Sequence, residues 1–451
     1  MNRTIKTGWW ICLFMAWVSC TDFLEEKPNA ALSTPHTLED LQAMLSNSNI
    51  FGKEPMLLEV STTDYYLEEE SWQSLADEAH KRAYVWGTQG LFQQNLSNDW
   101  KTVYDLVYYC NTVLEGLEDI ERNEKNEAVY DRIKGEALFF RGKSMLQAAL
   151  LWVEAYDDGL KDSKLGLPLR LDTDFNKTSV RSTMGETYGA ILEDLEAAVV
   201  LLPDYPHHLT RPSKAAAFGA LSRTCMAMRK YEEAFYYADE ALAIRQELLD
   251  FNVLDEQLSF PIPEYHEEVI FSSFFQIDQI LDHTRLLVSP ELFGLYREDD
   301  CRREILFSVA EDGKIYFKGR FAVGGYALFS GIATNELLLN RAECYARKEN
   351  YEMARADLRR LLDKRYRPGY VLDIEDDRLL SVILEERRKD LLFRGIRWMD
   401  IKRLNREGYN IVQQREAGGE MVSLSPHDLR YARPIPEFVI DISGMEQNPQ
   451  E

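Results

Sequence analysis

The sequence predicts a mainly α-helical fold, in which tetratricopeptide-like helical repeats pack against a loop-rich, irregular half with a few short strands. Three observations lead to this fold class. Apolar residues recur every three or four positions through much of residues 36–245, which is the period of a helix with one buried face. Two helix pairs, within residues 214–245 and 335–365, carry small residues at matching places. Residues 51–99 and 251–330 lack this period and are rich in aromatic residues, glycine and proline.

The N-terminus has the features of an export signal. Arg3 and Lys6 precede ten apolar residues, whereas a helix across a bilayer needs about 20, so residues 1–19 are predicted to be a signal peptide. Cys20 follows a small residue and precedes an acidic stretch, and this resembles a bacterial lipoprotein box, in which the cysteine is acylated and becomes the mature N-terminus. The alternative is an ordinary signal peptide that contains Cys20 by chance. We expect residues 20–35 to form a lipidated tether.

Residues 36–451 are predicted to form a single domain that begins with a helix. Thr37 is placed to cap this helix, with Asp40 three residues later as in a capping box. Apolar stripes at helical spacing then follow, and their apolar members are most simply core. These stripes cover residues 100–114, 137–149 and 184–199.

Two further helix pairs are of tetratricopeptide type. Alanine recurs on one face of each pair, which lets the two helices approach closely. The pairs are residues 214–228 with 231–245, and residues 335–347 with 351–365. Because one pair cannot bury its own apolar face, we expect the helical elements at about 100–245 and 335–405 to stack into a solenoid-like half.

Composition and motif content exclude several classes of protein. Among 451 residues, 52 Lys plus Arg stand against 76 Asp plus Glu, and the resulting charge of −24 would repel nucleic acid. Six cysteines show no zinc-type spacing. Asp172, Asp174 and Asn176 match the start of an EF-hand, but Lys177 occupies the glycine position, so we expect a solvated turn. With no triad or paired-carboxylate motif, the sequence predicts neither catalytic residues nor a metal or cofactor.

Short motifs follow one another in a fixed order along nearly the whole mature chain. They are Cys20 with residues 22–25 and Pro28, the helix with Trp100, Tyr104 and Asn111, residues 135–141 (GEALFFR), residues 165–169 (LGLPL), residues 341–343 (RAE), the run from Glu386 to Arg403, residues 434–436 (PIP) and residues 447–449 (QNP). Together they resemble the SusD/RagB family. The run from 386 to 403 is the most specific, although Asp390 and Arg394 stand where the family usually has Glu. We interpret this run as a folding signature.

The resemblance implies a function in nutrient uptake. Members of the family are surface lipoproteins that bind nutrients for a TonB-dependent outer-membrane transporter. We therefore expect a protein anchored through Cys20 on the outer face of the outer membrane, which delivers a polymer fragment, preferably an oligosaccharide, to a SusC-like TonB-dependent transporter. The alternatives are a peptide ligand, as in RagB-like members, a helical-repeat scaffold for a protein partner, and a surface hydrolase.

Candidate ligand-binding residues lie in the two irregular segments. Glycans need aromatic faces for their C–H surfaces and a few amide or carboxylate groups for their hydroxyls. By context, and without a family motif, the predicted residues are Asp64, Tyr65, Tyr66, Trp72 and Trp86 in the first segment and Tyr316, Phe321 and Tyr326 in the second. For any single aromatic residue, the alternative is packing in the core beneath a long loop.

Overall fold

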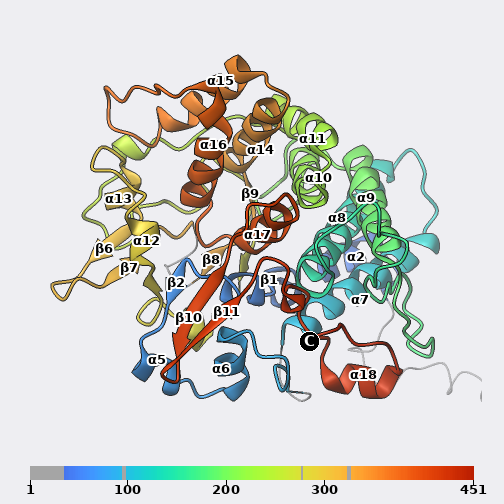
Figure 1. The fold of residues 1–451 in the computed structure, drawn as a ribbon. Helices are drawn as coiled ribbons and strands as arrows, with labels where there is room; N and C mark the ends of the chain where they lie inside the picture. Colours follow the sequence, from blue (N-terminus) through green and yellow to red (C-terminus); the bar gives the residue numbers. More distant parts are fainter. Residues whose placement is uncertain (1–34, 94–97, 276–277, 322–326, 451) are drawn as a thin grey trace, which may run out of the picture.

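Long helices form one side of the structure, and short strands with connecting loops form the other (Figure 1). The computed structural model describes residues 35–93, 98–275, 278–321 and 327–450. Within these ranges, no helix is both long and apolar enough to cross a membrane. The predicted fold class, mainly α with a helical half packed against a loop-rich half, is confirmed.

The longer helices build the helical half. They are α2 (Leu38–Leu45), α7 (Asp99–Glu118), α8 (Glu127–Trp152), α9 (Met184–Leu201), α10 (Lys214–Met228), α11 (Tyr231–Ile244), α14 (Thr334–Arg347), α15 (Tyr351–Leu362), α16 (Asp376–Asp390) and α17 (Arg397–Arg406). Shorter helices lie within the connecting loops. They are α3 (Ser48–Phe51), α4 (Leu57–Val60), α5 (Glu69–Gln73), α6 (Glu78–Tyr84), η2 (Phe251–Val253), η3 (Gln279–Leu281), α12 (Pro290–Phe293), α13 (Arg302–Ile305), η5 (Leu429–Tyr431) and α18 (Glu437–Ser443).

The two predicted helix pairs stack against each other. Helix α10 packs on α11, α11 on α14 and α14 on α15, so the two pairs form one continuous array (Figure 1). Ala216 and Ala220 of α10 are buried at this interface region, as the small-residue pattern predicts. Gly219 lies so close to Ile332 that a Cβ atom there would be 2.6 Å from its Cγ2, which limits this position to glycine. Stacking of the pairs is therefore as expected.

Side-chain caps fix the ends of the helices. The Thr37 side chain accepts from the backbone N–H of Asp40 at 3.1 Å, and the Asp40 carboxylate accepts from the N–H of Thr37, which completes the predicted capping box. The Ser213 hydroxyl caps α10 by accepting from the N–H of Ala216 at 3.2 Å. Helix α10 ends at Arg229, whose φ of 58° lies in the left-handed region.

Short strands join the two irregular segments across a long stretch of sequence. The strands are β1 (Lys53–Glu54), β2 (Tyr65–Tyr66), β3 (Val269–Phe271), β4 (Phe274–Phe275), β5 (Leu287–Val288), β6 (Phe307–Val309), β7 (Ile315–Phe317), β8 (Leu328–Phe329), β9 (Ile332–Ala333), β10 (Gln413–Ala417) and β11 (Glu420–Leu424). They form sheets with the orders β1-β4-β8, β2-β5-β7-β6, β3-β9 and β10-β11. In the first two sheets a strand of the first segment pairs with a strand of the second, so both segments belong to one structural unit.

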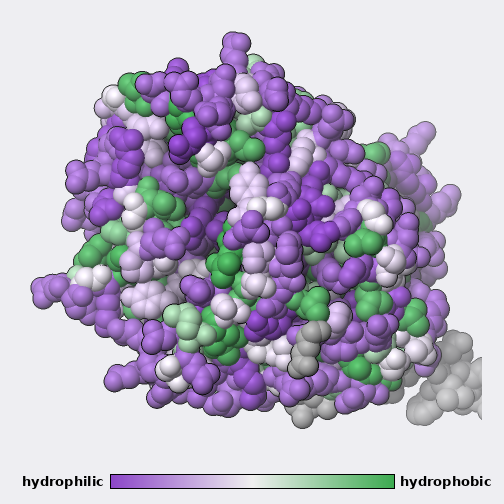
Figure 2. Space-filling model, viewed as in Figure 1, coloured by the Kyte–Doolittle hydropathy of each residue, from purple (hydrophilic) through white to green (hydrophobic). Residues whose placement is uncertain are grey.

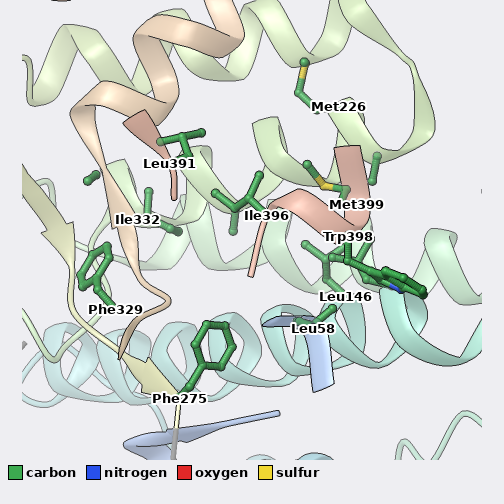
Figure 3. Close-up of a cluster of buried hydrophobic side chains, with 14 of the residues drawn as sticks. Leu58, Leu146, Met226, Phe275, Phe329, Ile332, Leu391, Ile396, Trp398 and Met399 are labelled. Atoms are coloured by element: carbon green, nitrogen blue, oxygen red, sulfur yellow. The ribbon is translucent and has the colours of Figure 1, made fainter. Parts of the chain in front are cut away.

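A shared apolar core connects this unit to the helices. Leu58 of α4, Leu146 of α8 and Phe275 of β4 meet Ile396 and Met399 next to α17 (Figure 3). All five are at most 3% exposed. Burial of a side chain of this size contributes about 1.5–3 kcal/mol, so the loop-rich half is held by the same core as the helices.

The run from 386 to 403 lies inside a buried ionic cluster. The Arg302 guanidinium contacts Asp300 at 2.8 Å, Glu386 at 2.5 Å and Asp390 at 3.2 Å. Arg365 contacts Asp390 and Glu268, both at 2.7 Å. Burial acts to raise the pKa of Asp390, but the Arg365 and Arg302 cations outweigh it and hold the pKa below its usual value. These side chains link α16 to the loops before it, which is the role of a folding signature.

Candidate functional site

Two of the predicted residues lie on the outer face of the sheet β2-β5-β7-β6. Leu287 of β5 pairs with Tyr66 on one side and with Tyr316 on the other, so the two tyrosines share a face and are two strands, about 10 Å, apart. Both are half-buried, whereas their neighbours Tyr65 and Phe317 turn to the core. An ion pair between Lys314 and Glu68, at 3.0 Å, lies beside Tyr66. We name Tyr66, Leu287 and Tyr316 the tyrosine face.

Trp72 lies on α5 against the tip of the hairpin β10–β11. Its Nε1 donates to the carbonyl of Lys81 at 3.2 Å, which fixes the indole. A Cβ atom added at Gly418 in the hairpin turn would lie 3.7 Å from the ring. The side chain is half-buried, so part of the indole remains open to a ligand.

Four other predicted residues are buried, which corrects the expectation that they contact a ligand. Trp86 is 0% exposed and its Nε1 donates to the carbonyl of Ser61 at 2.9 Å. Asp64 forms an ion pair with Arg388 at 2.7 Å, and Tyr65 donates to the carbonyl of Val60 at 3.2 Å. Phe321 packs edge-on against His266. The physical reason is that aromatic residues in these loops pack in the core beneath them, which was the alternative to contact with a ligand. Tyr326 and Cys20 lie outside the described residues.

A cavity of about 290 Å³ opens between the first irregular segment and the start of α7, near β1 and α6 in Figure 1. We name it the β1–α6 cavity. Its apolar wall comes from the first irregular segment, and its polar groups come from that segment, from Asp278 of the second segment and from Thr102 of α7. The apolar wall is made of Met56, Leu57, Ala79, Ala83, Leu91 and Phe92, and the polar groups are Glu54, Asp77, His80, Gln93, Asn98, Asp99, Thr102 and Asp278. An apolar wall with a few convergent polar groups is typical of a small-molecule site.

Hydrogen bonds from the protein hold the acidic side chains of the cavity. Asp77 caps α6 by accepting from the N–H of Ala79 at 2.8 Å, and Asp278 caps η3. The carboxylate of Glu54 is bound by the side chains of Lys143 and Gln147. These positions are therefore fixed before any ligand arrives.

Asp99 is the most buried acid of the cavity that has no cationic partner. It is 9% exposed and its Oδ2 accepts from the N–H of Leu57 at 2.7 Å. Burial raises the pKa of Asp99 to about 6, although hydrogen bonds from the backbone of Leu57 and Met56 lower it. His80 also lines the cavity, and its Nε2 lies 3.9 Å from the Asp278 carboxylate.

The cavity residues were not among the predicted ones, because nothing in their spacing brings them together. Asp77, Asp99 and Asp278 each stand at the start of a helix, where an acid is explained by capping and by the helix dipole. In the turn at 170–178, Lys177 Nζ lies 2.6 Å from the Asp172 carboxylate. Across the described ranges, no group of three or more His, Cys, Asp or Glu side chains is placed to hold a metal ion.

The face of the molecule in Figure 2 is mostly hydrophilic, with small scattered apolar patches. The exposed apolar side chains are distributed over many loops, and Phe175, at 80% exposed, is the most exposed aromatic residue among them. Single exposed apolar residues are normal on a protein surface, so they do not define an interface.

Two family models match parts of the chain that together cover most of its length. Residues 22–226 match the family model "Starch-binding associating with outer membrane", and residues 334–450 match the model "SusD family". No curated protein matches the chain.

Several solved structures share the fold. A SusD superfamily protein from Bacteroides thetaiotaomicron superposes with a TM-score of 0.74 at 20% identity, covering 92% of this chain and 100% of that one. A putative sugar binding protein from Bacteroides vulgatus gives 0.73 at 17% identity, covering 92% and 99%. A SusD-like carbohydrate binding protein from Bacteroides vulgatus gives 0.64 at 20% identity, covering 86% and 89%. At these identities, the likeness concerns the fold.

Proposed function

The chain belongs to the SusD/RagB family, and from this premise we propose that it captures oligosaccharide fragments of a nutrient polymer and delivers them to a SusC-like TonB-dependent transporter. The family is one of outer-membrane-associated binding proteins, so the chain binds a nutrient and is not an enzyme. In the proposal, acylated Cys20 holds the protein on the outer face of the outer membrane. The helical array α10, α11, α14 and α15 is the proposed docking surface for the transporter.

The β1–α6 cavity is the observation that carries the proposal of a saccharide ligand. Phe92 offers a half-buried ring in a wall that is otherwise aliphatic, which suits the C–H face of a sugar. The side chains of Gln93, Asn98 and Thr102, with the surrounding carboxylates, supply donors and acceptors for hydroxyl groups. Two structural relatives are named as sugar or carbohydrate binding proteins, which supports the same ligand class.

The tyrosine face is proposed as an outer part of the same binding surface. Residues 278–288 connect the two places, because Asp278 lines the cavity and Leu287 lies between Tyr66 and Tyr316. These two residues are nine positions apart in the sequence, so the chain places them within about 30 Å of each other. An oligosaccharide held in the cavity would reach the tyrosine face only if it has several sugar units.

Equilibrium binding of the full-length protein in detergent to a panel of oligosaccharides and peptides tests the proposal. We expect saturable binding to one saccharide class, and Phe92→Ala to weaken it at least about tenfold, equal to about 1.4 kcal/mol. Phe175→Ala is the matched control, because it removes the same side chain from an exposed loop elsewhere. Thermal unfolding of each variant shows whether the fold is retained.

Two outcomes would contradict the proposal. Binding of peptides but of no saccharide would assign the protein to the peptide-binding members of the family. Equal affinities for the wild type, Phe92→Ala and Phe175→Ala would place the binding site outside the β1–α6 cavity.

A further inference from the structure

The charged side chains that line the β1–α6 cavity are mainly negative. Four of its lining residues are acids, namely Glu54, Asp77, Asp99 and Asp278, while no lysine or arginine lines it among the residues that the structure describes. Lys143 forms an ion pair with Glu54, and His80 lies 3.9 Å from Asp278, which leaves Asp77 and Asp99 facing the cavity without a basic side chain at contact distance. A cavity of this kind attracts a cation and repels an anion.

Asp99 distinguishes the cavity from an ordinary acidic patch. Among the buried carboxylates of the described chain, every one except Glu59 and Asp99 contacts a lysine or arginine. Glu59 is enclosed by protein, with its two oxygens accepting from Thr62 and from the N–H of Gly395. Asp99 instead lines an open cavity, so its missing partner has a place to bind.

Resting on the proposed function, we infer that the β1–α6 cavity selects oligosaccharides that carry a protonated primary amine, that is, amino sugars with a free amino group, through Asp99 and its neighbours Asp77 and Asp278. The ammonium group supplies the counter-charge that the protein lacks at Asp99. A saccharide carrying carboxylate or sulfate groups would place like charges together and is excluded.

The composition of the walls favours an amino sugar over a lysine-rich peptide. A lysine side chain offers one ammonium group on a flexible stem, and its charge is the only group that the cavity could recognise. A sugar ring presents several hydroxyl groups, which match Gln93, Asn98 and Thr102, and an apolar C–H face, which matches Phe92. These neutral polar groups would have no function in binding a lysine side chain.

Matched ligands test the inference. Binding of the full-length protein in detergent is measured near pH 7 with glucosamine oligomers, with their N-acetylated forms of equal length, with galacturonic acid oligomers and with oligolysine. We expect the free amine to bind about tenfold or more tightly than the acetylated form, and the uronic acid not to bind. The preference for the amine is expected to weaken with added salt, since screening acts on the charge but not on the acetyl group.

Asp99→Asn identifies the residue responsible. This substitution keeps an oxygen for the N–H of Leu57 but removes the charge, so the ratio of amine to acetylated affinity is expected to fall about tenfold. Asp119→Asn is the control, because Asp119 is an exposed acid beyond the other end of the same helix, about 30 Å away. We expect this control to leave the affinity ratio unchanged.

The outcomes separate the inference from the proposed function. If neutral and amine-bearing oligomers bind equally in the wild type, or if Asp99→Asn leaves their ratio unchanged, the inference is overturned while saccharide binding stands. If oligolysine binds more tightly than the amino sugar, the assignment to a saccharide is overturned. If no oligosaccharide in a broad panel binds the folded protein, the proposed function fails, and the inference fails with it.

Discussion

Asp64 and Arg388 lie 324 positions apart in the sequence, yet two guanidinium nitrogens of Arg388 donate to one oxygen of the Asp64 carboxylate, at 2.9 and 2.7 Å. Asp64 is 2% exposed and precedes β2, while Arg388 belongs to α16. The pair therefore joins the first irregular segment to the C-terminal helical region. It also explains why an acid expected to bind a ligand has a structural role instead.

Asp64→Asn is expected to lower the free energy of unfolding by about 3 kcal/mol, because it removes the buried partner of the largely buried Arg388 cation and leaves it only the exposed carboxylate of Glu291, at 3.2 Å. Chemical denaturation measures the change. Asp312→Asn serves as the control, since Asp312 is an exposed acid in the turn between β6 and β7, and we expect a change within about 0.5 kcal/mol. Equal effects of the two variants would contradict the structural role of Asp64.

Trp86 and Trp72 are expected to respond differently to truncation. Trp86→Ala removes a fully buried indole and its hydrogen bond to Ser61, and should destabilise the protein by about 3–5 kcal/mol. Trp72→Ala removes a half-buried side chain at the edge of α5 and should cost less, about 1–2 kcal/mol. Thermal or denaturant unfolding of both variants provides the comparison. A smaller loss of stability for Trp86→Ala than for Trp72→Ala would be inconsistent with this packing.

The stability of the protein is expected to depend on pH through Asp99. Its pKa of about 6 in the folded state exceeds the ordinary value of 3.8, so the folded protein binds the proton more tightly than the unfolded chain. The free energy of unfolding therefore falls as pH rises from about 4 to about 6. Above that range, the buried Asp99 carboxylate lowers it by a constant amount of about 3 kcal/mol. Asp99→Asn should thus stabilise the protein at pH 7 relative to the wild type, with little difference below pH 4.

Denaturant unfolding of the wild type and of Asp99→Asn across this pH range measures the effect. Asp119→Asn is again the matched control, because its side chain is exposed. If the free energies of unfolding of the wild type and Asp99→Asn changed in parallel between pH 4 and 7, burial would not raise the pKa of Asp99.

The tyrosine face is expected to matter more for long ligands than for short ones. Tyr66→Ala and Tyr316→Ala each remove one half-buried ring from the outer face of the sheet. We expect each to lower the affinity for a hexasaccharide several-fold and to have a smaller effect on the affinity for a disaccharide. Calorimetry with a series of chain lengths measures this dependence. Tyr205→Ala is a suitable control, because this tyrosine is 64% exposed and lies in the loop between α9 and α10. An effect that does not vary with ligand length would argue against an outer part of the site.

Some of the fold follows from the sequence because its causes are local. The capping box at Thr37 and Asp40, the cap at Ser213 and the break at Arg229 depend on residues within one or two turns of a helix. Alanine on one face of α10 predicts a close helix pair for the same reason. A short-range pattern in the sequence is enough to indicate these features.

The binding site depends on contacts that no local pattern contains. The sequence predicts a ligand-binding surface in residues 51–99 and 251–330, and the cavity proposed for it is lined mostly by the first of these segments, with Asp278 from the second and Thr102 from α7. It also marks Tyr66 and Tyr316, but not their common face, which results from the pairing of both with Leu287. Residue type cannot distinguish a buried Trp86 from a half-buried Trp72, because burial is decided by what packs above each side chain.

The sequence by itself determined the family and the helix pairs, since these are indicated by short motifs and by hydrophobic periodicity. The tertiary structure alone decided which acids are paired and which are not. Asp64 meets Arg388 only because the chain just before β2 lies beside α16, and Asp99 faces an open cavity only because α7 begins beside β1 and α6. The physical reason is that charge compensation and burial depend on distance in space, and the segments that set this distance lie 324 positions apart for Asp64 and Arg388 and 42 positions apart for Asp99 and Leu57.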